Sequence, residues 1–88
     1  MQYEFEKSFV RDYQKVKEKD LAKAILEAIN TVSEASSIKD IRNVKKLSGF
    51  KSAYRIRVGD YRIGCRLRNE KIVFVAFAHR KDIYKKFP

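Results

Sequence analysis

The sequence is poor in the residues from which several common sites are built. Its one cysteine, Cys65, excludes an intrachain disulfide framework and leaves no cysteine pair for a structural zinc site. A reducing, cytoplasmic compartment is therefore expected. No apolar run approaches the roughly 20 residues that span a bilayer, and the opening MQYEFEKSFVRDYQ lacks the continuous apolar stretch of a signal peptide. We expect a chain that is neither secreted by such a signal nor embedded in a membrane.

Conventional hydrolase machinery is missing as well. The sequence has no Gly-rich phosphate loop and no cluster of metal-ligating residues. One histidine and one cysteine cannot build a catalytic triad of the usual kind. We therefore expect no metal and no cofactor.

Positive charge, in contrast, is abundant and unevenly distributed. The formal net charge is +10, with six basic and seven acidic residues in 1–38, ten and two in 39–68, and five and two in 69–88. These segments carry −1, +8 and +3. The second half of the chain is thus suited to nucleic acid or to an acidic protein partner, and a merely solvated charged surface is the alternative.

The apolar pattern predicts one α+β domain over residues 1–88, a length that supports a single small core. A strand at MQYEF precedes a helix whose apolar positions are Phe5, Phe9, Tyr13 and Val16. Asp20 is the expected N-cap of a second helix that ends near SEASS. Its apolar stripe comprises Leu21, Ala24, Ile25, Ala28, Ile29 and Val32.

The remainder predicts a connecting segment followed by strands. Residues 38–52 form a basic connector with a turn at Gly49, and AYRIRV, YRIGCRL and KIVFVAFAH are three successive strands. The expected fold is an N-terminal strand and a two-helix hairpin packed on a mainly antiparallel sheet of three to four strands.

A tight turn at Gly59-Asp60 sets the register of the first two of these strands. It places Val58 opposite Tyr61 and Arg57 opposite Arg62. One face then carries Tyr54, Ile56, Val58, Tyr61, Ile63, Cys65 and Leu67. The other, which we name the arginine face, carries Arg55, Arg57, Arg62, Gly64, Arg66 and Arg68.

The same count, continued through a turn at Asn69-Glu70, assigns the faces of the third strand. Ile72, Phe74, Ala76 and Ala78 are expected to pack against the helices. Val73, Val75, Phe77 and His79 are expected on the arginine face. An exposed apolar strip of this kind indicates a covering element, either the C-terminal segment of this chain or another chain.

Like charges directly across a strand pair are destabilising, so the opposed arginines call for an explanation. Their long stems can splay into water at small cost. We favour phosphate binding, because planar guanidinium groups make bidentate contacts with phosphate oxygens. Further candidate RNA-binding residues are Lys45, Lys46, Lys51 and Arg66.

Metal-free cleavage of RNA needs a group that takes the 2′-hydroxyl proton, cations that stabilise the charged transition state, and an acid for the leaving 5′-oxygen. His79 is the candidate for proton transfer, because an imidazole titrates near neutral pH. Arginine stays protonated but stabilises developing negative charge. Tyr84 can stack on a base or donate a proton.

Three motifs, KKLSG at 45–49, YRIRVGDYRIG at 54–64 and HRKDIY at 79–84, resemble those of the RelE/ParE superfamily of bacterial type II toxins. RelE members are ribosome-dependent endoribonucleases that cut mRNA in the A site, and a cognate antitoxin neutralises each. The resemblance implies catalytic roles for Arg55, Arg57, Arg62, Arg80 and Tyr84, to which we add His79. At the first two positions the best-studied ribonuclease type has lysines, so this sequence keeps the charge there but not the lysine's proton-transfer role.

The resemblance also implies partners and leaves alternatives. The expected partners are the ribosome, mRNA and an acidic antitoxin, which we place on Val73, Val75 and Phe77. The ParE branch shares the fold but inhibits DNA gyrase without known RNA cleavage. A catalytically degenerate toxin that only docks on RNA is the third possibility.

Overall fold

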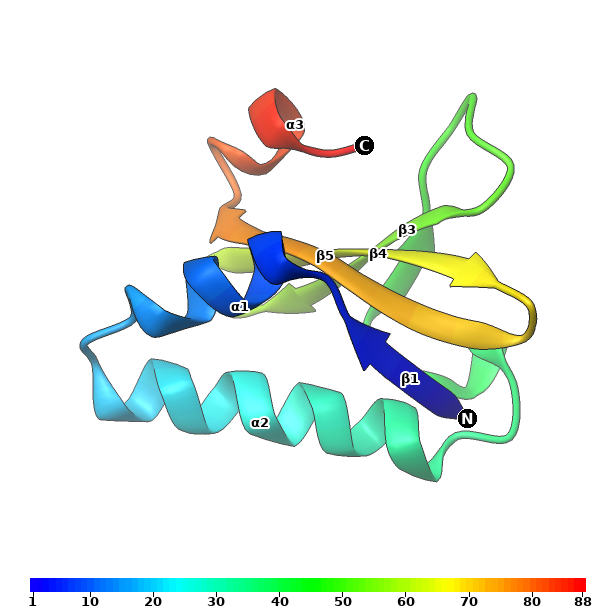
Figure 1. The fold of residues 1–88 in the computed structure, drawn as a ribbon, viewed down its shortest axis with the longest axis horizontal. Helices are drawn as coiled ribbons and strands as arrows, with labels where there is room; N and C mark the ends of the chain where they lie inside the picture. Colours follow the sequence, from blue (N-terminus) through cyan, green and yellow to red (C-terminus); the bar gives the residue numbers. More distant parts are fainter.

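The computed structural model describes all residues from 1 to 88 and shows a twisted sheet with helices on both sides (Figure 1). Two helices, α1 and α2, cover one face, and the short helix α3 stands over the other. In chain order the elements are β1 (Gln2–Phe5), α1 (Lys7–Gln14), α2 (Lys19–Glu34), a 3₁₀ turn (Ile38–Asp40), β2 (Val44–Lys46), β3 (Ala53–Val58), β4 (Tyr61–Arg68), β5 (Lys71–His79) and α3 (Ile83–Lys86).

The sheet has five strands in the order β1-β5-β4-β3-β2. Strand β1 runs parallel to β5, and the other pairs are antiparallel. The α+β architecture is confirmed, with one strand more than expected. The additional strand is β2, in the segment that we predicted to be a connector. Three residues, two of them exposed lysines, carry no alternating pattern, so only pairing with β3 identifies this strand.

Both predicted helices are present, with small differences at their starts. Phe5 belongs to β1 rather than to the first helix, because its backbone pairs with Phe74 of β5. Glu18 occupies the N-cap position of α2, without a side-chain hydrogen bond, so the prediction of Asp20 as the N-cap was wrong. Asp20 lies in the first turn, where its carboxylate interacts favourably with the positive end of the helix dipole. None of the helices combines the length and the apolar composition needed to cross a bilayer.

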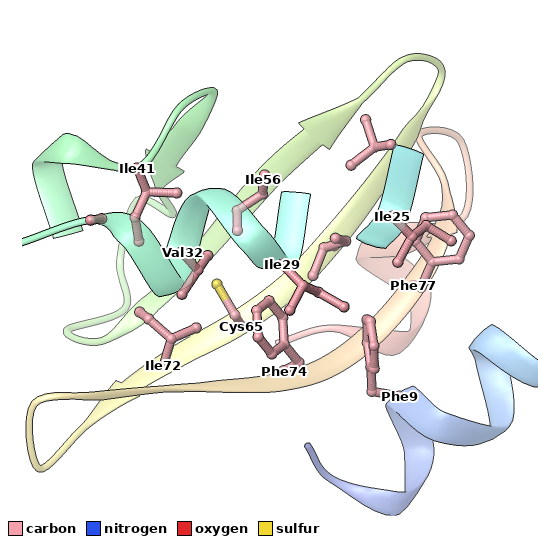
Figure 2. Packing of buried hydrophobic residues seen from close by; sticks show 13 residues of the cluster. Phe9, Ile25, Ile29, Val32, Ile41, Ile56, Cys65, Ile72, Phe74 and Phe77 are labelled. Atoms are coloured by element: carbon pink, nitrogen blue, oxygen red, sulfur yellow. The ribbon is translucent and has the colours of Figure 1, made fainter. Parts of the chain in front are cut away.

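The main core lies between the two long helices and the sheet. Figure 2 shows Phe9 of α1 and the α2 side chains of Ile25, Ile29 and Val32 directed toward the strands. Cys65 of β4 is fully buried in this layer, and burial raises the pKa of its thiol to about 12. The thiol is therefore protonated at neutral pH and has a packing role.

Candidate functional site

The hairpin register predicted from Gly59-Asp60 is confirmed. Val58 pairs with Tyr61 and Arg57 pairs with Arg62 across β3 and β4. Gly59 has a φ of 58°, a left-handed conformation that glycine adopts without steric cost. Because paired residues project to the same side, the arginines of these strands lie on one face, opposite the helices α1 and α2.

The register of β5 departs from the prediction beyond its middle. Cys65 pairs with Phe74 as expected, but Gly64 pairs with Ala76, so the ladder skips Val75. This irregularity is a β-bulge, in which an extra residue reverses the faces of the residues that follow. Phe77 and His79 therefore lie on the helix side, opposite Ile63 and Tyr61, while Ala76 and Ala78 turn to the arginine face. The predicted faces of these four residues were wrong.

The apolar strip that we predicted to be exposed is buried. Val73 is 2% exposed, Phe77 is 5% exposed and packs in the main core, and Val75 is partly covered. The premise for placing an antitoxin on these three residues is therefore wrong. The large apolar side chains that remain exposed are Tyr3, Phe5, Val10, Leu26, Phe50 and Tyr84.

The chain's own C-terminal segment covers part of the arginine face. Ile83 and Phe87 are buried there with Ala53 and Ala76 in a second, smaller core. The Phe87 ring lies so close to Gly64 that a Cβ at this position would be 2.5 Å from its Cδ2 atom. The predicted RNA-binding residue Arg66 stands over the same ring, with its guanidinium carbon 5.1 Å from the ring centroid, so part of its cationic face is already engaged.

Asp12 of α1 binds both the end of β5 and the C-terminal segment. One of its carboxylate oxygens accepts a hydrogen bond from the backbone N–H of Phe77 at 2.9 Å. The other accepts one from Nζ of Lys86, in α3, at 2.8 Å. This carboxylate therefore ties the last helix to the end of β5, and so helps to hold Arg80 and Tyr84 near the arginine face.

Arg62 is at the electrostatic centre of the arginine face. Its guanidinium donates hydrogen bonds to the carbonyl oxygens of Gly59, at 3.0 Å, and Tyr61, at 2.9 Å. Desolvation by partial burial, and then the positive charges of Arg55 and Arg57, lower the pKa of Arg62. Tyr84 and Arg80 also act on this pKa, in opposite directions. Arg57 pairs with Arg62 across the hairpin, and Arg55 and Tyr84 border one cavity. With Arg80, whose charge also acts on Arg62, five of the six predicted catalytic residues belong to the same part of the arginine face.

The sixth, His79, is on the other side of the sheet. Its ring meets Tyr61 edge-on, with the centroids 5.3 Å apart. Its Nδ1 accepts the backbone N–H of Lys81 at 3.1 Å, so the proton of the neutral ring is on Nε2. Tyr61 in turn stacks on Phe77 in the main core. The bulge at Val75 has therefore separated this histidine from the arginines.

The predicted RNA-binding lysines are not equivalent. Lys45 pairs with Arg55 across β2 and β3, which places it on the arginine face, whereas Lys46 pairs with Tyr54 at the end of β2. Both lysines, together with Arg55 and Tyr84, border a cavity of about 320 Å³. Lys51 is exposed in the loop after β2 and does not border this cavity.

Phe50, which we did not predict as a site residue, borders the same cavity. Its signal in the sequence is a single aromatic residue inside the basic, Gly-containing segment KKLSGFKS. No group of three or more His, Cys, Asp or Glu side chains in the structure is arranged to hold a metal ion.

Known proteins are similar to this chain over almost its whole length. Residues 3–84 match the family described as the ParE toxin of the type II toxin-antitoxin system, parDE. The chain is 39% identical to Toxin RelE3 of Methanocaldococcus jannaschii over 85 residues, which cover 96% of both proteins.

Two solved complexes show the same fold. The RelB-RelE antitoxin-toxin complex from Methanococcus jannaschii matches with a TM-score of 0.76 and 38% identity, over 96% of this chain and 98% of the other. The archaeal RelE-RelB complex from Pyrococcus horikoshii matches with a TM-score of 0.69 over 90% and 93% of the two chains. At 23% identity, the second likeness supports the fold alone. The chain thus belongs to the ParE toxin family of the RelE/ParE superfamily and is a type II toxin of the RelE kind.

Proposed function

We propose that this toxin is a ribosome-dependent, metal-free endoribonuclease that cuts mRNA and so inhibits translation. The observation that supports this proposal best is the cluster of Arg55, Arg57, Arg80 and Tyr84 around Arg62. Desolvation, and then the like charges of Arg55 and Arg57, lower the pKa of Arg62, and a bound phosphodiester offsets the repulsion between these charges. Such a cluster is already organised for the extra negative charge of a phosphorane-like transition state.

The substrate supplies the nucleophile in this reaction. The 2′-hydroxyl oxygen loses its proton to a water molecule and attacks the neighbouring phosphorus. A 2′,3′-cyclic phosphate forms as the bond to the 5′-oxygen breaks, and this oxygen takes up a proton and leaves as an alcohol. Arg62 and Arg80 stabilise the charge on the phosphoryl oxygens, with Arg55 and Arg57 adding to the field. Tyr84, whose side chain is 59% exposed beside them, is the proton donor that we assign to the leaving oxygen.

We expect His79→Ala to retain most of the cleavage rate, with an unchanged dependence of rate on pH. The reason is that His79 lies across the sheet from the arginines and that its Nδ1 is occupied by the Lys81 N–H. Rates measured between pH 5 and pH 9 check this, with Tyr84→Phe, which lacks the proton donor, as the comparison. A dependence of rate on pH that differs between His79→Ala and the unmodified toxin would return the proton-transfer role to His79.

We propose a cognate acidic antitoxin as the partner that restrains the toxin in the cytoplasm, where ribosomes and mRNA are found. The relatives from Methanococcus jannaschii and Pyrococcus horikoshii were solved as complexes with RelB antitoxins. A net charge of +10 fits an acidic partner, and covering the arginine face with carboxylates would block access to RNA.

A second candidate function is inhibition of DNA gyrase without cleavage of nucleic acid. The description of the matching family, which names ParE and parDE, favours it. Binding to gyrase, however, has no evident need for a proton donor and several guanidinium groups around one point.

Induction of the toxin without its antitoxin separates the two candidates. We expect pulse-labelled methionine incorporation to fall first and thymidine incorporation to continue, with growth restored when the acidic protein encoded beside the toxin is co-expressed. Loss of thymidine incorporation while translation continues would instead support the gyrase candidate. Primer extension on a reporter mRNA would then locate the cuts within codons.

A further inference from the structure

Two aromatic residues that are about half exposed, Phe50 and Tyr84, border one basic cavity. Phe50 is 49% exposed and Tyr84 is 59% exposed. Phe50 belongs to the loop between β2 and β3, and Tyr84 belongs to α3. In Figure 1 this loop and α3 stand on the same side of the sheet. The cavity of about 320 Å³ lies between these two segments.

The local structure gives no reason for an apolar ring at position 50. The backbone N–H of Phe50 closes a turn on the carbonyl of Leu47 at 3.4 Å, which any non-proline residue could do. Its side chain belongs to neither hydrophobic core. Packing in the cores therefore does not account for the aromatic residue at this position, and the exposed half of the ring can contact a ligand at the cavity.

The rim of the cavity indicates the chemistry of this ligand. Lys45, Lys46 and Arg55 supply positive charge, and no acidic side chain borders the cavity. Aromatic faces beside a cationic track are the arrangement by which proteins hold single-stranded nucleic acid, since bases stack on the rings while lysine and arginine contact the phosphates. An acidic protein segment would use the lysines but would gain little from ring faces.

We propose that Phe50 forms a nucleobase subsite, in which one unpaired RNA base stacks on its ring while the adjoining phosphates contact Lys45 and Arg55. This inference rests on the proposed function, because it assigns RNA as the ligand of the arginine face. It adds a binding residue outside the catalytic cluster. A stacked base would fix the position of the strand and hence the phosphodiester presented to Arg62.

The test uses single-stranded RNA with 2′-O-methyl groups, which binds but cannot be cleaved, and with 2-aminopurine placed at successive positions. The intact protein is expected to quench the fluorescence at one position through stacking. Removing the base there should weaken binding about tenfold, within the range measured for one stacked base. Phe50→Ala should lose both the quenching and about tenfold in affinity, with an unchanged salt dependence because no phosphate contact is removed.

A double comparison separates stacking from a general effect of the loop. Phe50→Ala should bind abasic RNA no more weakly than the intact protein does. The matched control is Leu26→Ala, which removes an exposed apolar side chain from α2, on the other side of the sheet. This variant should keep both the quenching and the RNA affinity of the intact protein. Retained quenching in Phe50→Ala, no quenching with the intact protein, or an equal loss on abasic RNA would each overturn the subsite.

Further outcomes distinguish this inference from the proposed function. If Phe50→Ala binds RNA normally but no longer binds the antitoxin, the ring contacts protein and the subsite is wrong. If the intact toxin blocks translation and Phe50→Ala binds RNA equally well, only the subsite fails. If stacking depends on Phe50 but translation continues after induction, the subsite stands and the ribonuclease proposal fails.

Discussion

Arg62→Ala is expected to lower kcat for RNA cleavage by about 10² to 10³-fold, the usual effect of removing one donor that stabilises transition-state charge. Arg62 is the guanidinium on which the other charged groups of the arginine face act, and its two hydrogen bonds to the hairpin turn fix its direction. The side chain contributes little to folding, because it lies outside both cores. The rate should therefore fall while the melting temperature changes little.

Single-turnover cleavage on programmed ribosomes measures this effect, with circular dichroism as the check on folding. Arg11→Ala is the matched control, because it removes the same charge from an exposed position of α1, outside the arginine face. Arg62→Lys should give an intermediate rate, since lysine keeps the charge but not the planar pair of donors. A folded Arg62→Ala variant with the rate of the unmodified toxin would remove Arg62 from the catalytic site.

Gly64→Ala is expected to destabilise the toxin by about 1–3 kcal/mol, the usual cost of overpacking a core. The new methyl group would lie 2.5 Å from Cδ2 and 2.6 Å from Cγ of the Phe87 ring, so the ring must move. Movement of Phe87 opens the small core that holds α3 against the sheet. The melting temperature measured by thermal unfolding should fall by roughly 10 °C, because each kcal/mol lowers it by a few degrees in a domain of this size.

A double-mutant cycle tests whether this cost arises from the contact between Gly64 and Phe87. Phe87→Ala alone should cost about 3–5 kcal/mol, as for other buried phenylalanines. In that background Gly64→Ala should add almost nothing, because the ring that it would meet is gone. If the two losses simply add, Gly64 is needed for another reason, such as backbone conformation.

The same variants should affect cleavage through α3, which carries Tyr84. Gly64→Ala should reduce kcat even at temperatures where the protein is folded, because the proton donor is no longer held beside the arginines. Tyr84→Phe in the Gly64→Ala background should then cause a smaller further loss than it does in the unmodified toxin. An equal further loss would show that α3 keeps its position without the Phe87 contact.

The hairpin of β3 and β4 could be predicted from the local sequence. Gly59-Asp60 is a two-residue turn, and in a strand pair the turn sets every later pairing. The division into an apolar face and an arginine face follows from side-chain alternation alone. Family motifs in the same region then point to the RelE/ParE superfamily, which the similarity to known toxins confirms.

Two features of the site, strand β2 and the bulge in β5, could not be predicted from the local sequence. Strand β2 has three residues and exists because β3 offers it an edge. With the bulge at Val75, Phe77 lies in the main core and Ala76 lies in the second core with Phe87. Both faces of β5 therefore carry apolar residues. An alternating pattern cannot reveal the bulge, because Val, Ala and Phe are acceptable on either side.

The basic character of the toxin, its α+β class, the hairpin register and the position of Arg55, Arg57 and Arg62 on one face could all be predicted from the sequence. These features depend on composition and on residues close together in the chain. Three other features were visible only in the folded chain: His79 leaves that face, Val73 and Phe77 are buried, and Phe50 and Tyr84 border one cavity. These outcomes depend on packing between segments far apart in the sequence, where small differences in burial select one register over another.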